Sequence, residues 1–225
     1  MLPDFEQQFI PTIGRASAVK HKYKKPNELD LNENMRPLLS IWIKPRKTFE
    51  FIEKREEVRN TNAVNTLIFF GTMTAGFSNA NDIIKVLEIN PYIGLLIAMI
   101  FSGLLGLLLF HFVATPIILL TSKLFQGKAK FKEIKLTIAY SQVPNLVHLI
   151  IGVIVIVLSL ISGNSEILIF ENNFTFYVLL LFSFSIVLYG LAYFNKYSYG
   201  YALLTLLIPM TLFQGIIYLV RFIIT

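Results

Sequence analysis

The 30 residues from Tyr92 to Thr121 read YIGLLIAMIFSGLLGLLLFHFVATPIILLT. This stretch contains no Asp, Glu, Lys or Arg, and it exceeds the roughly 20 residues that a helix needs to cross the hydrocarbon core of a bilayer. Inside a bilayer every backbone polar group must be paired within the protein, which favours a helix over irregular chain. The stretch therefore predicts a transmembrane helix.

Four further apolar segments of spanning length surround this one. Short alternating segments, which would indicate a transmembrane barrel, do not occur. The sequence predicts an all-α fold, a polytopic membrane helical bundle with about five transmembrane helices over residues 62–225 and a cytosolic N-terminal tail. The expected spans are Asn62 to Ala80, Tyr92 to Thr121, Leu136 to Ile161, Phe174 to Asn195 and Tyr199 to Phe222.

The composition agrees with a membrane protein. Of the 225 residues, 55% are hydrophobic and only 15% are charged, whereas soluble domains average about 25% charged residues. The chain has no cysteine, which excludes disulfides, thiolate catalysis and cysteine–zinc sites.

Basic residues are distributed very unevenly between the two sides of the predicted bundle. Twelve lysines and arginines precede Asn60, five lie between the second and third spans, and Lys196 lies between the fourth and fifth. Only Lys85 and Arg221 fall on the opposite side. The positive-inside rule then predicts a cytoplasmic N-terminus and an external C-terminus in the cell membrane. It also accounts for the net charge of +6 without a nucleic-acid partner.

The segment before the first span divides into two parts. Residues 1–35 are polar, and we expect a disordered cytosolic tail. Residues 36–61 are amphipathic, with a helix expected from Pro45 onward, where Phe49 and Ile52 share one face. We interpret this segment as lying on the inner membrane surface. The alternative is an ordinary amphipathic helix packed under the bundle.

The proposed contact with the membrane surface has a defined anchor. Trp42 is the single tryptophan of the chain, and an indole beside basic side chains suits the headgroup layer. Lys44, Arg46 and Lys47 would attract anionic lipids. The predicted partner of this segment is the lipid bilayer.

Two motifs carry a resemblance to a known family. The first runs from Gly127 to Ile134 (GKAKFKEI) and continues through Ala139 to Pro144 (AYSQVP). The second is Ile41 to Phe49 (IWIKPRKTF), just before the first span. Together with the five-span layout they resemble the Yip domain family, the Ypt/Rab-interacting proteins and their bacterial relatives.

The resemblance implies a polytopic membrane protein with a cytosolic N-terminal tail, and the richness in Ile, Lys, Asn and Phe favours a member from an AT-rich bacterium. Eukaryotic relatives act in vesicle traffic and contact small GTPases, and they carry an acidic Asp-Leu-Tyr-Gly-Pro-like stretch before the membrane. The nearest stretch here, Asp30 to Glu33, does not fit that pattern, so GTPase binding is not implied for this chain.

No catalytic motif is present in the sequence. The predicted spans hold no interior Asp, Glu, Lys or Arg, which argues against a carboxylate-coupled carrier. Walker, His-Glu-x-x-His and Gly-x-Ser-x-Gly patterns are also missing. We therefore expect a protein that is not an enzyme and that needs no cofactor and no metal.

Four polar residues inside the spans form the candidate intramembrane cluster. His111 and His148 are predicted at matching depths on neighbouring antiparallel helices, and Gln142 and Asn145 flank Pro144, a predicted helix kink. The functional interpretation is a proton step, a metal-binding pair or a polar cavity. The alternative is hydrogen bonding between helices. We predict that the two histidines face the interior and lie near each other, in a structural role.

Small residues indicate where helices pack closely, and prolines where they bend. Ala98, Ser102 and Gly106 recur every four residues, which allows close approach within the bundle or between protomers. Pro116 and Pro209 are expected to kink their helices.

These observations leave two main functional hypotheses. The first is a non-enzymatic membrane protein that organises or remodels its membrane, or recruits partners, with a homo-oligomer or another membrane protein as a possible assembly. The second is a small channel or carrier for a neutral solute. A lipid-modifying enzyme comes third. A continuous hydrated cavity would favour the channel, and a tightly packed bundle the first hypothesis.

Overall fold

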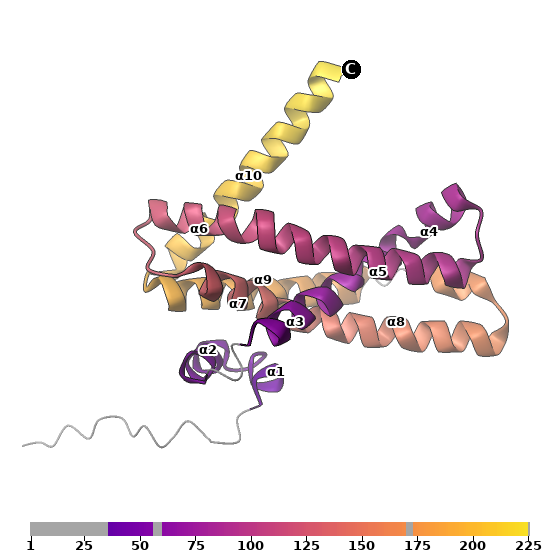
Figure 1. The fold of residues 1–225 in the computed structure, drawn as a ribbon, viewed down its shortest axis with the longest axis horizontal. Helices are drawn as coiled ribbons and strands as arrows, with labels where there is room; N and C mark the ends of the chain where they lie inside the picture. The colour runs from indigo at the N-terminus through magenta and orange to yellow at the C-terminus, as the bar shows by residue number, and fades with distance from the viewer. Residues whose placement is uncertain (1–35, 56–59, 170–172, 225) are drawn as a thin grey trace, which may run out of the picture. The chain divides into compact units, whose positions relative to one another are not determined.

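The computed structural model describes residues 36–55, 60–169 and 173–224, and every regular element in these ranges is a helix (Figure 1). The all-α prediction is therefore confirmed. Three stretches are long and apolar enough to cross a membrane, namely Pro91–Leu124, Phe131–Ser162 and Thr175–Asn195. These three stretches indicate a multi-pass membrane protein. The count of five spans stays a prediction. The predicted tail, residues 1–35, lies outside the described residues.

Two short helices precede the first span, and both begin at a proline. Helix α1 covers Pro37–Ser40 and α2 covers Pro45–Lys54, as the sequence predicted for Pro45. A proline suits the first helical turn because the N–H it lacks would have no partner there. Helix α2 buries one face, which consists of Thr48, Phe49, Phe51 and Ile52.

The first predicted span consists of two helices instead of one. Helix α3 covers Thr61–Met73 and α4 covers Ala75–Leu87, with the break at Thr74. The Thr74 hydroxyl donates to the Gly71 carbonyl at 2.8 Å, a local bond that competes with the regular helix. Each helix alone would measure about 20 Å, less than the hydrocarbon thickness of a bilayer.

The second predicted span is continuous but irregular near its proline. It consists of α5 (Pro91–Leu109), a π-helical turn (Phe110–Ala114) and α6 (Thr115–Leu124). Because Pro116 has no N–H, the regular bonding pattern cannot continue through it. The Thr115 amide instead bonds the Phe110 carbonyl, five residues back. The expected effect of Pro116 thus takes the form of a π-helical turn.

The third predicted span is divided at the position where a proline was expected to disturb it. Helix α7 covers Phe131–Ser141 and α8 covers Val143–Ser162. Gln142 separates them, and Pro144 occupies the first turn of α8. Gly163, with φ of +67°, ends α8 in the left-handed conformation that glycine tolerates best.

The last two predicted spans are single helices. After a 3₁₀ turn at Ser165–Ile169, α9 covers Asn173–Asn195 and α10 covers Tyr199–Ile224 with Pro209 inside it. Lys196, with φ of +57°, forms the tight turn between them. Both helices match the predicted segments within a few residues.

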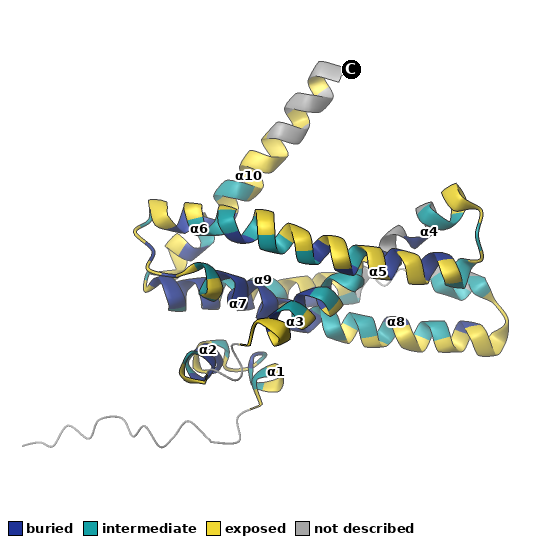
Figure 2. Ribbon diagram, in the orientation of Figure 1, coloured by how far each residue is buried: buried dark blue, intermediate teal, exposed yellow. Residues whose placement is uncertain are grey.

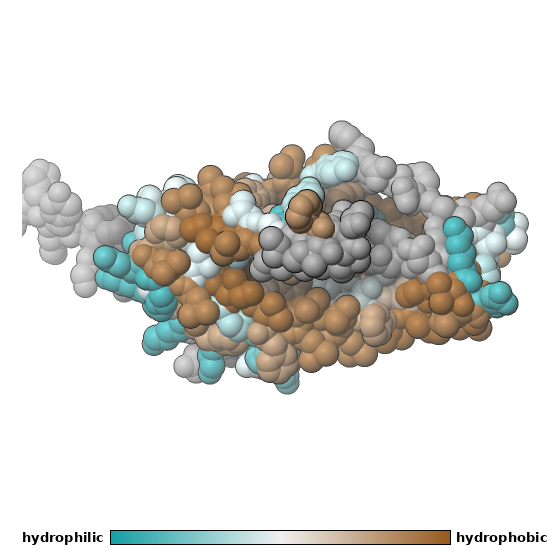
Figure 3. All heavy atoms as spheres, turned by 90° about the horizontal axis from the view of Figure 1, so that it is seen from above, coloured by the Kyte–Doolittle hydropathy of each residue, from teal (hydrophilic) through white to brown (hydrophobic). Residues whose placement is uncertain are grey.

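The helices bury one set of side chains against one another and leave many large apolar side chains exposed. Helix α7 contacts α3, α6 and α9, and it is almost wholly buried beyond its first turn (Figure 2). Leu96, Phe101, Ile150 and Leu181 are each more than half exposed. Figure 3 shows an extensive apolar surface with hydrophilic residues mostly toward its two ends. Such a surface suits lipid contact and would be unfavourable in water.

Close packing confirms the predicted role of the Ala98–Ser102–Gly106 stripe within the bundle. Ala98 is fully buried on the face of α5 that contacts α4. A β-carbon at Gly76 would lie only 2.5 Å from the Met99 backbone, and one at Gly106 would overlap the Thr72 side chain. The small residues therefore let α3 and α4 approach α5 directly.

Candidate functional site

Lys135 on α7 is the centre of a polar cluster at the end of the bundle that carries the 125–130 loop, here called the loop end. Its Nζ donates to Asn65 Oδ1 on α3 at 2.7 Å and lies 2.9 Å from His111 Nδ1 in the π-helical turn. The residue is only 7% exposed. Since an ammonium group can only donate, the imidazole accepts at Nδ1 and carries its own proton at Nε2.

A cavity of about 360 Å³ opens beside this cluster. His111 also packs edge-on against Phe131, the first residue of α7, with ring centroids 5.5 Å apart. The cavity wall combines two lysines, an imidazole and a hydroxyl with apolar side chains. The lining residues are Thr61, Val64, His111, Phe131, Lys132, Lys135 and Leu136.

Lys135 is not among the site residues predicted from the sequence, because the charge pattern places this lysine in the loop between the second and third spans. Helix α7 in fact begins at Phe131, where the Lys130 amide donates to Glu133 Oε2 at 2.8 Å. The signal that could have identified Lys135 is its place in the apolar run between Ile134 and Leu136. A lysine in such a run is buried as soon as the helix includes it.

The predicted histidine pair is wrong, because the two rings have different neighbours. His111 lies with Lys135 and Phe131, whereas His148 on α8 stacks on Phe77 at 6.3 Å and meets the edge of Phe176 at 6.4 Å. His148 lies 17 positions after Phe131, a helical distance of about 25 Å. The matching depths assumed from the sequence therefore do not occur.

The loop explains the difference in depth. Lys123 Nζ donates to the carbonyls of Gly127 at 2.7 Å and Ala129 at 3.1 Å, so residues 125–130 run back along α6. Phe125 and Gln126 close α6 in a turn, and the four residues that follow can cover at most about 14 Å. As a result α7 starts closer to the level of His111 and not level with the end of α6.

Gln142 and Asn145 form a pair of their own. The side-chain Nδ2 of Asn145 donates to Gln142 Oε1 at 2.8 Å, and the two residues are about one helical turn apart. A β-carbon at Gly71 of α3 would overlap the Gln142 side chain, so the two segments are in direct contact there. His111 therefore lies apart from the other three residues of the predicted cluster, while His148 is one turn beyond Asn145 on α8 but stacks on Phe77.

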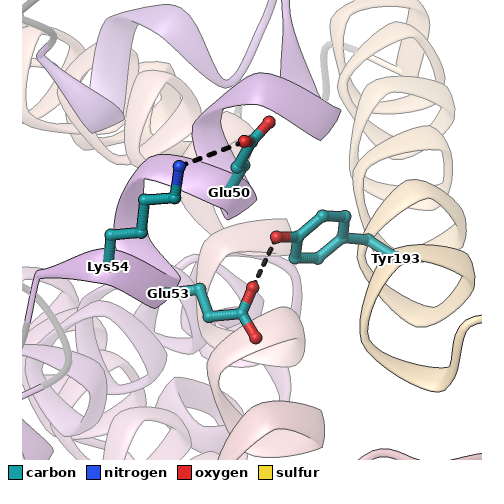
Figure 4. Close-up of polar contacts among 4 residues, drawn as sticks. All are labelled: Glu50, Glu53, Lys54 and Tyr193. Carbon is teal, nitrogen blue, oxygen red and sulfur yellow. Dashed lines mark hydrogen bonds and ion pairs between the residues drawn. The ribbon is translucent and has the colours of Figure 1, made fainter. Parts of the chain in front are cut away.

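Helix α2 is packed under the bundle, which is the alternative that the sequence left open. Phe49 lies edge-on to Tyr140 at 6.2 Å and to Phe194 at 5.7 Å, and Trp42 contacts Phe182 at 5.3 Å. The Tyr193 hydroxyl of α9 donates to Glu53 of α2 (Figure 4). Within α2, Lys54 pairs with Glu50 at 3.3 Å.

The basic side chains of this segment remain accessible. Lys44, Arg46 and Lys47 are exposed, and so are Leu39 and Ile43 beside them. The apolar face of α2 is thus covered by protein, while its basic edge and α1 face outward. Binding of these residues to anionic lipid stays a prediction.

Asn195 ties the loop to the turn between α9 and α10. It is 1% exposed; its Oδ1 accepts from the Ala129 amide at 3.2 Å, and its Nδ2 donates to the Tyr197 hydroxyl at 3.2 Å. The Tyr197 and Thr205 hydroxyls lie 2.9 Å apart. Burial raises the pKa of Tyr197, so its hydroxyl stays protonated and can donate to Thr205.

Comparison with known proteins gives a match over most of the chain. The family model described as the Yip1 domain matches residues 39–221. No curated protein and no solved structure matches the chain. Within the described ranges, no group of three or more His, Asp or Glu side chains could hold a metal ion.

Proposed function

The chain belongs to the Yip1 domain family, and from this membership we propose that it is a non-enzymatic integral membrane protein that organises or remodels the bilayer around it, or recruits partners to it. We place it in the cell membrane with its N-terminus in the cytoplasm and its C-terminus outside. The family match and the apolar helices support a membrane protein. The specific role rests on the packing described next.

The observation that carries this proposal is the close contact between Gly71 and Gln142. The channel hypothesis needs a continuous polar path past Gln142 and Asn145. Instead, α3 lies directly against Gln142, and the Gln142 amide oxygen is occupied by Asn145. Other polar groups pair between helices, such as Tyr92 of α5 with Ser159 of α8 at 3.1 Å. Pairing of polar groups within the protein favours a packed bundle over a hydrated passage.

Two further features fit an action on the bilayer. The helix Pro91–Leu124 has 34 residues and would measure about 51 Å, well beyond a hydrocarbon core of about 30 Å. Such mismatch is relieved by tilt or by local thickening of the bilayer. The exposed basic edge at Lys44, Arg46 and Lys47 adds attraction to an anionic leaflet.

A separate exposed surface on α10 could serve to recruit a partner. Beyond Pro209, α10 exposes Met210, Leu212 and Phe213. This stretch can contact lipid, a second copy of the chain or another membrane protein.

Reconstitution of the full chain into vesicles tests the proposal. We expect the permeability to glycerol, followed by stopped-flow light scattering, to equal that of protein-free vesicles. We also expect the distribution of vesicle diameters, measured by cryo-electron microscopy, to change with the protein-to-lipid ratio. The triple variant Lys44→Gln/Arg46→Gln/Lys47→Gln serves as a matched control, because it removes the basic edge and leaves the buried face of α2 intact.

Two results would count against the proposal. Glycerol flux that rises in proportion to the protein content would favour the channel. Unchanged vesicle diameters at every ratio would remove the remodelling role and leave only recruitment.

A further inference from the structure

We propose that the cavity beside Lys135 binds a phosphate group, carried either by an anionic lipid headgroup or by a soluble phosphate ester. This inference concerns one site, and it holds or fails independently of the remodelling role proposed above. It rests on the hydrogen bonds of Lys135, on the charges that line the cavity and on the level of the cavity along the helices.

The hydrogen bonds of Lys135 leave one donor for a ligand. An ammonium group has three N–H donors. Two are directed to Asn65 Oδ1 and His111 Nδ1, which fixes the position of Nζ, and Lys135 lines the cavity. The third N–H is therefore held in place by its two neighbours. A lysine oriented in this way can meet an anion without further ordering of its long side chain.

The positive charge of the site also favours binding of an anion. Lys135 is 7% exposed, and among the described residues no carboxylate pairs with it. A buried charge without a counter-charge is costly, and a bound anion would offset that cost.

The cavity wall offers more donors of the kind that bind phosphate. Lys132 contributes a second ammonium group, Thr61 a hydroxyl and His111 the N–H at Nε2. Lysines recognise phosphate as compact point charges, without the planar geometry that an arginine fork requires. Helix α7 also begins at this cavity, but its Lys130 amide is already bonded by Glu133, so the side chains carry the argument.

The level of the cavity matches that of lipid headgroups. Phe131, which lines the cavity, is the first residue of the candidate span Phe131–Ser162, and Lys135 lies about one helical turn further along this span. The cavity therefore lies at one end of this span, close to the layer that the phosphates of lipid headgroups occupy.

The test uses the full chain in nanodiscs of phosphatidylcholine. Phosphatidic acid is titrated into the discs, and the number of bound molecules is counted by native mass spectrometry. In parallel, glycerol 3-phosphate and inorganic phosphate are measured by equilibrium dialysis. We expect saturable binding of one phosphate compound per chain, weakened by added salt.

Three variants locate the binding. Lys132→Gln and Lys135→Met each remove one ammonium group from the cavity, and each should weaken binding about tenfold, as expected for a charge-assisted hydrogen bond. Lys128→Gln removes an exposed lysine of the same loop end that does not line the cavity, and should leave binding unchanged. Because Lys132 is exposed, its variant tests the site even if Lys135→Met does not fold.

The measurements distinguish a lipid headgroup from a soluble phosphate ester, and two results would overturn the proposal. Binding of phosphatidic acid alone assigns the site to a lipid headgroup, and equal binding of glycerol 3-phosphate assigns it to a soluble ester. Loss of binding by Lys128→Gln to the same degree as by Lys132→Gln would show diffuse surface charge and overturn the proposal. Failure of all three compounds to bind would also overturn it.

Discussion

Gly71 and Lys135 show what single residues decide in this protein. Gly71 lets α3 contact Gln142 directly, where any β-carbon would overlap the glutamine side chain. Lys135 brings a positive charge into the interior between α3 and the π-helical turn. Gly71 thus permits close packing of the interior, and Lys135 makes part of the interior polar.

At Gly71 we predict a clear loss of stability on substitution. Gly71→Ala should lower the free energy of unfolding by about 1–3 kcal/mol, because overpacking forces the neighbouring segments apart. Denaturant titration in detergent micelles measures this change. Gly215→Ala is the control, since no atom lies within 4 Å of its β-position and alanine favours the helix. Equal effects of both substitutions would contradict the packing described here.

The sequence predicted the polar residues better than it predicted their partners. Gln142 and Asn145, which flank Pro144, bond each other within one segment of the chain, whereas the sequence offered a polar cavity or hydrogen bonding between helices for them. The proximity of His111 and His148 depended on the path of residues 125–130, which a sequence does not give. Lys135 was assigned to a loop because the third span was predicted to start at Leu136, five residues after Phe131, where α7 begins.

At the scale of elements, α2 shows how an amphipathic helix can be covered by protein. Its apolar pattern predicted a buried face, and Phe49 and Ile52 are both fully buried. The pattern does not say what covers the face, because a membrane surface and a helix bundle satisfy it equally well. In the structure the cover is α9, joined through Phe194 and Tyr193.

We predict that the Tyr193 hydroxyl holds α2 against α9. Tyr193→Phe removes the hydrogen bond to Glu53 and should weaken docking by about 1–2 kcal/mol. A cysteine placed at Ile52 in this cysteine-free chain should then react faster with a maleimide, because α2 detaches more often. Tyr199→Phe, which changes a half-exposed tyrosine, should leave the rate unchanged. An equal rate in both variants would mean that the hydrogen bond does not contribute to docking.

At the scale of the whole molecule, the two basic loops meet at one end. Asn195, beside the turn that contains Lys196, bonds the amide of Ala129 in the loop that contains Lys128. Both loops carry positive charge that the sequence assigned to the cytoplasmic side. Their contact means that the spans between them run in the alternating directions expected from the charge count, although the count of five stays a prediction.

The predicted orientation can be tested with reporter fusions. Alkaline phosphatase fused after Thr225 should be active, because that enzyme functions only outside the cytoplasm, whereas fusion after Gln126 should give no activity. The reason is the strong excess of lysine and arginine on the side of the tail and the two loops. Activity of the Gln126 fusion with none at Thr225 would reverse the orientation. Activity at neither would indicate an even number of spans.

The bond between Ala129 and Asn195 also has a consequence for biosynthesis. These residues are 66 positions apart, so the ribosome must translate the whole of α8 and α9 before the loop can acquire its partner. Until then the Ala129 amide and the neighbouring lysines remain accessible to water or to a chaperone. Helices α6 and α7 are thus synthesised early, but the loop between them acquires its hydrogen bond to Asn195 late. A chain that stops before Asn195 would keep residues 125–130 open to proteases, whereas the full-length chain released from the ribosome would protect them.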